Sequence, residues 1–124
     1  MEQEKFSWQK RMNSFQYALS GWRLLFKSEH NSWLHFAATI IVIISAFLFR
    51  VTGSEAGLLT VAIGIVWIAE LFNTCIEKMM DFISKEDHPA IKLIKDVSAG
   101  AVLMATLTSV IIGCFVFIPK ILTR

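Results

Sequence analysis

The sequence has 124 residues, of which 55% are hydrophobic and 12% are aromatic, and its formal net charge is +2. The length corresponds to a single domain, and the charge is too small and too dispersed to favour a nucleic-acid partner. Long uncharged runs in so short a chain favour a membrane protein over a soluble one. We therefore expect residues 1–124 to form one integral-membrane domain.

Residues 4–28 have the pattern of an amphipathic helix. Apolar residues recur at alternating steps of four and three positions, namely Trp8, Met12, Phe15, Leu19, Trp22 and Phe26. Lysines and arginines lie off this apolar stripe. The pattern is typical of a helix that lies in the membrane interface, with its aromatic face in the lipid and its basic groups near anionic headgroups. A soluble helix packed on a protein partner is the alternative.

Three transmembrane helices are predicted after this segment, at residues 33–51, 56–82 and 97–118. Each contains an uncharged run long enough to account for most or all of a bilayer crossing. Asn31 or Ser32 is expected to cap the first of them. Pro89 is expected to begin a separate short helix at 90–95, and Pro119 is expected to end the third span.

Lysine and arginine are unevenly distributed among the segments outside the spans. They are frequent before the first span and in the loop between the second and third, whereas the first loop is nearly bare. The positive-inside rule therefore predicts that the N-terminus and the second loop are cytoplasmic and that the C-terminus is outside.

The second predicted span ends in a polar stripe. Glu70, Asn73, Glu77 and Asp81 are spaced i, i+3, i+7 and i+11, which places them within one narrow stripe of a helix. Each charged residue near a bilayer centre costs roughly 2.5–3.5 kcal/mol on insertion scales. A metal ion, a cationic partner or a water-filled site must offset this cost, so the stripe indicates function.

Polar residues from distant parts of the sequence are expected to meet at the cytoplasmic face. Glu29 precedes the first span, Lys95 and Asp96 precede the third, and the polar stripe ends the second. The opposite halves of all three spans are apolar, whereas an ion path would distribute polar groups through the whole membrane. The arrangement therefore favours chemistry at the interface over transport.

The spacing of the acidic residues suggests different roles for them. Glu70 and Glu77 are about 10 Å apart along a helix, too far to ligate one small ion easily. Glu77, with Glu29, is placed for the Mg²⁺ of a nucleotide, because Mg²⁺ typically takes one or two carboxylates plus phosphate oxygens. Glu70 lies deeper, where it is expected to act as a base on a lipid hydroxyl, and Lys95 would complement phosphate charge. The sequence has neither a P-loop nor a protein-kinase glycine loop.

Two motifs resemble the prokaryotic diacylglycerol kinase family. Residues 70–81 match E-x-x-N-[ST]-[AC]-[IV]-E-x-x-[VM]-D, and residues 95–102 match K-D-x-x-[AS]-[AG]-A-V. Tyr17, Gly21 and Glu29 agree at the spacings of the family. The resemblance implies a surface helix, three transmembrane helices and a homotrimer with active sites between subunits, in the bacterial inner membrane with the active site cytoplasmic.

The resemblance also implies roles for individual residues. Glu70 resembles the general base and lipid contact, and Ala99 resembles a second lipid contact. Asn73 and Asp81 match the motif as residues that orient the glutamates, with a structural hydrogen-bond role as the alternative. Glu29 and Glu77 resemble the ligands of Mg²⁺ bound with ATP. The implied nucleotide contacts are Lys10, Tyr17, Glu29, Glu77, Glu86, His88, Lys95 and Asp96. Lys10 lies where some members have arginine. Lysine keeps the positive charge but cannot form the two parallel hydrogen bonds that a guanidinium group makes.

The family phosphorylates either diacylglycerol or undecaprenol. Residues 87–89, 99–102 and 118–120 look more like the undecaprenol branch, as does His35, although a lone histidine is more often a packing residue than a ligand. Undecaprenol is therefore favoured over diacylglycerol as the acceptor. Two hypotheses from other classes are a small multidrug transporter and an inactive structural subunit. Binding of Mg-ATP would distinguish the kinase from the transporter.

Overall fold

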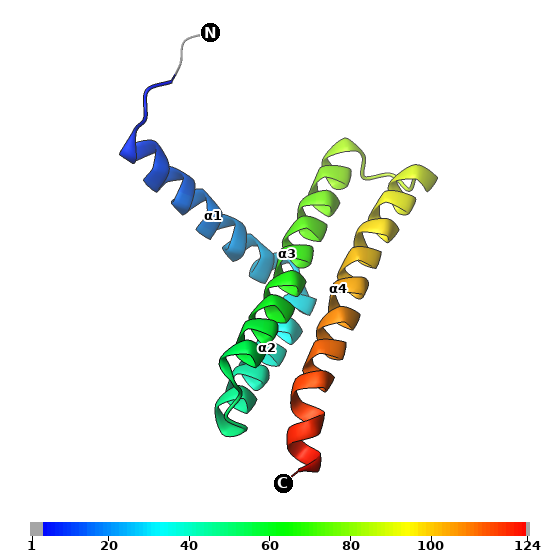
Figure 1. Ribbon diagram of the computed structural model, residues 1–124. Coiled ribbons are helices and arrows are strands. Elements are labelled where there is room, and N and C mark those ends of the chain that lie inside the picture. The colour runs from blue at the N-terminus through cyan, green and yellow to red at the C-terminus, as the bar shows by residue number, and fades with distance from the viewer. Residues whose placement is uncertain (1–3, 124) are drawn as a thin grey trace.

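The computed structural model describes residues 4–123, and all the regular secondary structure in this range is helical. Its four helices are α1 (Trp8–Ser28), α2 (His30–Leu48), α3 (Gly53–Ile83) and α4 (Pro89–Leu122) (Figure 1). The last three are long and apolar enough to cross a membrane. The predicted all-α class with three candidate spans is therefore confirmed.

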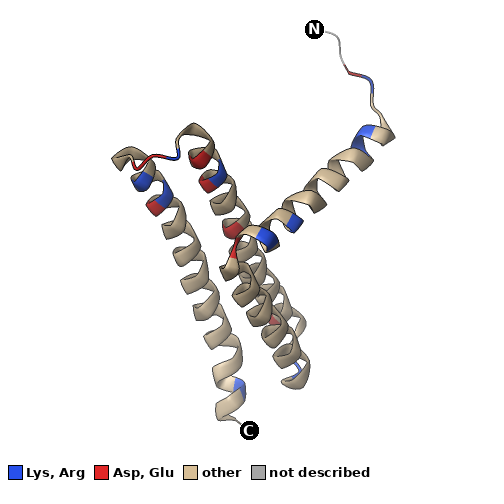
Figure 2. Cartoon of the chain, turned by 180° about the vertical axis from the view of Figure 1, so that it is seen from behind, with Lys and Arg blue, Asp and Glu red and all other residues tan. Residues whose placement is uncertain are grey.

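The three apolar helices differ in length. α2 has 19 residues and is about 28 Å long, close to the hydrocarbon thickness of about 30 Å. α3 and α4 have 31 and 34 residues, so they are about 46 and 51 Å long and extend beyond α2. Acidic and basic residues gather on these extensions and at the corner between α1 and α2 (Figure 2).

The corner between α1 and α2 consists of one extended residue. Glu29 has φ −120° and ψ 113°, and its N–H donates a hydrogen bond to the carbonyl of Leu25. α2 begins immediately afterwards at His30, three residues before the predicted start of 33. Ser32 therefore lies inside the helix and does not cap it, and its Oγ donates to the carbonyl of Glu29 at 2.6 Å. The predicted surface helix at 4–28 also begins later, at Trp8.

α3 begins three residues before the expected position 56 because its N-terminus is well capped. The hydroxyl of Thr52 accepts a hydrogen bond from the N–H of Glu55, and the Glu55 carboxylate accepts one from the N–H of Thr52. This is a capping box, which satisfies two backbone donors that the helix leaves unpaired. The preceding turn places Arg50 in the left-handed region, with φ 52°.

α4 is one continuous helix, so the predicted break between 90–95 and 97–118 is wrong. Pro89 occupies the first turn, where its missing N–H costs nothing, and the Nδ1 atom of His88 accepts a hydrogen bond from the N–H of Ala90. Pro119 does not end the helix. It lies in the last turn, where few residues follow, and the helix continues to Leu122.

α3 packs against α4 along most of its length, whereas α1 contacts α3 only near its own C-terminal end and its N-terminal part points away from the pair (Figure 1). Ser109 Oγ donates to the carbonyl of Ala62 at 2.6 Å, and Lys120 pairs with Glu55 at 2.9 Å near the end away from the α3–α4 loop. The fully buried Leu25 anchors the C-terminal end of α1. Most other side chains of α1, including Trp8, are exposed, and the interfacial role of this helix stays a prediction.

Candidate active site

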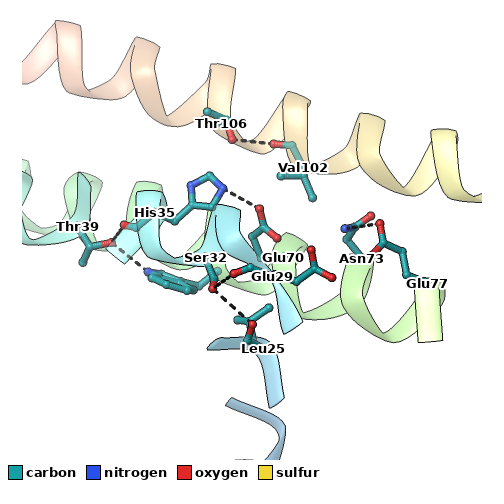
Figure 3. Close-up of polar contacts among 11 residues, drawn as sticks. Leu25, Glu29, Ser32, His35, Thr39, Glu70, Asn73, Glu77, Val102 and Thr106 are labelled. Carbon is teal, nitrogen blue, oxygen red and sulfur yellow. Dashed lines mark hydrogen bonds and ion pairs between the residues drawn. The ribbon is translucent and has the colours of Figure 1, made fainter. Parts of the chain in front are cut away.

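The carboxylate of Glu70 is buried where α3 passes the start of α2. The residue is 3% exposed, and Oε1 lies 2.7 Å from Nε2 of His35 (Figure 3). A buried carboxylate needs a hydrogen-bond partner or a counter-charge, and this imidazole supplies it. His35 was not among the predicted site residues. The available signal was that an imidazole in an uncharged span needs a polar partner, and the polar stripe of α3 offers one.

Glu29 and Glu77 come together beside Glu70. Burial raises the pKa of Glu29 above its usual value, and the charge of Glu77, a hydrogen bond to Glu77 and the charge of Glu70 raise it further. Like charges at short distance disfavour ionisation, and the nearby charge of Lys78 opposes this effect only in part, so a bound cation would stabilise the charged carboxylates. Figure 3 shows the Glu29 side chain extending from the corner toward α3.

Asn73 links this acidic group to α4. Its Oδ1 accepts a hydrogen bond from Ser98 Oγ at 2.8 Å, and its Nδ2 lies 3.5 Å from Glu77 Oε1. Asn73 and Ser98 are both buried, so the strong hydrogen bond between them is protected from water. The geometry is consistent with the predicted orienting role of Asn73, which stays a prediction.

A cleft of about 700 Å³ with many charged lining residues lies beyond Glu77, at the C-terminal end of α3 and the N-terminal end of α4. It is lined by six of the charged or polar residues around the α3–α4 loop, namely Asp81, Lys85, Glu86, His88, Lys95 and Asp96. Lys95 Nζ pairs with Asp81 Oδ1 at 2.6 Å, so the two motif residues contact each other across the helices. The cleft therefore brings together four of the residues that were predicted to contact a nucleotide.

Three predicted site residues lie apart from this group in the single chain. Lys10 pairs with Glu4 at 2.8 Å on the exposed part of α1, and Tyr17 is 73% exposed. Figure 1 shows why, since α1 meets the other helices at its C-terminal end and its N-terminal part lies away from the α3–α4 loop. Ala99 is exposed on α4, next to the buried Ser98. A nearby subunit would be needed to bring Lys10 and Tyr17 to a cleft.

The model of the prokaryotic diacylglycerol kinase family matches residues 16–117 of the chain. The chain belongs to this family. The match includes the corner, the first two spans, most of the third and both motifs. The resemblance drawn from the motifs is therefore confirmed, and the protein is a lipid kinase of the membrane.

Three curated relatives within the family cover most of the chain. The undecaprenol kinase of Bacillus subtilis (strain 168) is 38% identical over 95 residues, 77% of each protein. The diacylglycerol kinase of Synechocystis sp. is 32% identical over 123 residues, 96% of this chain and 70% of the relative. The diacylglycerol kinase of Pseudomonas aeruginosa is 31% identical over 94 residues, 76% of each protein.

The carboxylates fit a magnesium ion that is shared with a phosphate ligand, but not a preformed metal cage. Within residues 4–123 no group of three or more histidine, cysteine, aspartate or glutamate side chains is arranged to hold a metal. Glu29 and Glu77 supply two carboxylates at one place, and Mg²⁺ commonly takes one or two carboxylates and completes its shell with phosphate oxygens and water. The ion would therefore bind together with its nucleotide.

Proposed function

We propose that this lipid kinase transfers the γ-phosphate of Mg-ATP to the primary hydroxyl of a membrane lipid alcohol at the cytoplasmic face of the bacterial inner membrane. The observation that carries the proposal is the buried Glu70 carboxylate beside the Glu29–Glu77 pair. This arrangement offers a base and a cation site next to each other, at the level where α1 ends and α2 begins.

Helix lengths support a site that is half in the membrane and half in water. If α2 spans the hydrocarbon, its first residues and Glu70 lie near the membrane surface. Asp81 lies eleven residues further along α3, about 16 Å beyond Glu70, where the polar cleft would be in water. A soluble nucleotide can therefore reach the cleft while a lipid hydroxyl reaches Glu70 from the bilayer.

Each group has a separate task in the proposed reaction. Glu70 accepts the proton of the lipid hydroxyl while that oxygen attacks the γ-phosphorus and the bond to ADP breaks. Glu29 and Glu77 would hold Mg²⁺, which neutralises charge on the phosphates when it is bound. The proposed nucleotide cleft is lined by Glu86, His88, Lys95 and Asp96. Asn73 would orient Glu77, and Asp81 would orient Lys95.

The incomplete site of one chain supports a homotrimer with shared active sites. Lys10 and Tyr17 lie on the part of α1 that is away from the cleft, so a second chain would have to bring these residues to it. Co-reconstitution of inactive Tyr17→Ala and Glu70→Gln chains tests this arrangement. Shared sites predict recovery of part of the activity in the mixture, whereas sites built from one chain predict none.

We favour undecaprenol as the acceptor and keep diacylglycerol as the alternative. Identity is higher to the relative named undecaprenol kinase than to the two named diacylglycerol kinases, at 38% against 32% and 31%. The test offers both alcohols together in mixed micelles with labelled ATP and separates the two phosphorylated products. Predominant labelling of undecaprenol supports the proposal, and predominant phosphatidic acid favours the alternative. The transporter hypothesis is not favoured, because the family is one of kinases.

A further inference from the structure

Two polar contacts join α2 to α3 one helical turn apart. His35 Nε2 contacts Glu70 Oε1 at 2.7 Å, and Trp67 Nε1–H donates a hydrogen bond to Thr39 Oγ1 at 3.1 Å. The helices run in opposite directions, so a step of four residues forward on α2 corresponds to three residues back on α3. The second contact thereby fixes the register in which His35 meets Glu70.

The imidazole of His35 is held on several sides. Its side chain is 19% exposed, and its ring meets Trp67 edge-on with centroids 6.3 Å apart. Trp67 is itself packed by Trp22 and Phe26 of α1, at 5.3 and 5.6 Å between ring centroids. Tight packing around a side chain restricts its rotamers, so the imidazole N–H is directed at one oxygen of the carboxylate.

We propose that His35 is a positioning residue for Glu70, an inference that rests on the proposed kinase function. Its Nε2–H binds Oε1 and leaves Oε2 available for the lipid hydroxyl. In the reaction the lipid O–H bond breaks and its proton passes to Oε2, a bond forms between the lipid oxygen and the γ-phosphorus, and the bond to ADP breaks. His35 remains bound to Oε1 throughout, so the base is held at one angle to its substrate.

Substitutions at His35 separate the N–H donor from the size of the side chain. His35→Leu removes the donor, and we expect kcat to fall about 10–100-fold, as when an outer partner of a functional ligand is lost. The KM for ATP should stay unchanged, because the nucleotide cleft is formed by other residues. His35→Gln keeps an N–H at nearly the same reach and should restore most of the loss. His35→Asn, whose side chain is one methylene shorter than that of glutamine, should not restore kcat.

The assay measures labelled phosphate transfer to the lipid, together with ATP affinity and the melting temperature in detergent for each variant. His30→Leu is the matched control, because His30 also belongs to α2 but is exposed. In a Glu70→Gln background, His35→Leu should cause no further loss of kcat, because both changes then affect the same step.

The results separate the positioning role of His35 from the proposed kinase function. Wild-type kcat in His35→Leu, with Glu70→Gln inactive, overturns the positioning role but leaves the proposed function standing. Equal turnover of His35→Gln and His35→Asn overturns it too, and this pair is informative even if the leucine variant does not fold. A wild-type protein that transfers no phosphate to any lipid alcohol overturns the proposed function instead.

Discussion

Replacement of Glu70 by glutamine removes the proposed base and leaves almost everything else in place. Glutamine has nearly the same volume, and its side-chain oxygen can still accept the hydrogen bond that His35 gives to Oε1. Because the two side chains have nearly the same volume, the change creates no cavity, and because the residue is only 3% exposed, it removes one buried negative charge. We therefore expect the free energy of unfolding to stay the same or to rise.

The expected loss of activity follows from the contribution of a general base. Such a group contributes about 10²–10⁴-fold, and each factor of ten corresponds to about 1.36 kcal/mol of activation free energy. Glu70→Gln should therefore lower kcat at least about 100-fold. The KM for ATP should change little, because the residues that line the proposed nucleotide cleft lie beyond Glu70, at the end of α3 and the start of α4.

The assay measures initial rates of labelled phosphate transfer to lipid at varied ATP, with purified protein in mixed micelles. Glu55→Gln is the matched control, since it makes the same change on the same helix at the end away from the site, and glutamine can keep the capping box. Near-normal kcat in Glu70→Gln would refute the base assignment. A loss that appears entirely in the KM for ATP would refute it as well.

Three further predictions concern other residues of the site and of the corner between α1 and α2. Glu77→Gln should raise the Mg²⁺ concentration that gives half-maximal activity, measured by metal titration at saturating ATP, whereas Glu55→Gln should not; an unchanged titration would contradict the metal-ligand role. Ser98→Ala leaves the buried Asn73 oxygen unpaired and should lower the free energy of unfolding, measured by denaturation in detergent, by about 1–3 kcal/mol. A free energy of unfolding equal to that of wild type would show that the hydrogen bond between Ser98 and Asn73 does not stabilise the protein. Leu25→Ala leaves a cavity at a fully buried position of the corner and should lower the free energy of unfolding by about 2–5 kcal/mol in the same measurement. A decrease below about 1 kcal/mol would mean that the surrounding residues move to fill the cavity.

The long uncharged runs were sufficient to predict three apolar helices, but the ends of these helices depend on local contacts. The start of α2 at His30 results from Glu29 being the one extended residue between two helices. The continuation of α4 through Pro119 reflects the small loss that proline causes in a last turn. Neither the start of α2 at His30 nor the continuation of α4 past Pro119 can be predicted from hydrophobic periodicity.

The convergence of Glu29 and Glu77 could be expected from the sequence, because topology brings the ends of the spans to one face of the membrane. The pairing of His35 with Glu70 could not be predicted with the same certainty. It depends on the register of α2 against α3, which the contact between Thr39 and Trp67 determines. The positions of Lys10 and Tyr17 depend on the direction of α1, which their own sequence pattern does not encode.

The most direct test of the account is whether purified wild-type protein forms a phosphorylated lipid from labelled ATP. The measurement compares micelles that contain undecaprenol, diacylglycerol or no alcohol, with Mg²⁺ present and then removed by chelation. The account predicts labelled lipid that depends on both the alcohol and Mg²⁺, with undecaprenol preferred. Labelled inorganic phosphate without any labelled lipid, or no reaction with either alcohol, would contradict it.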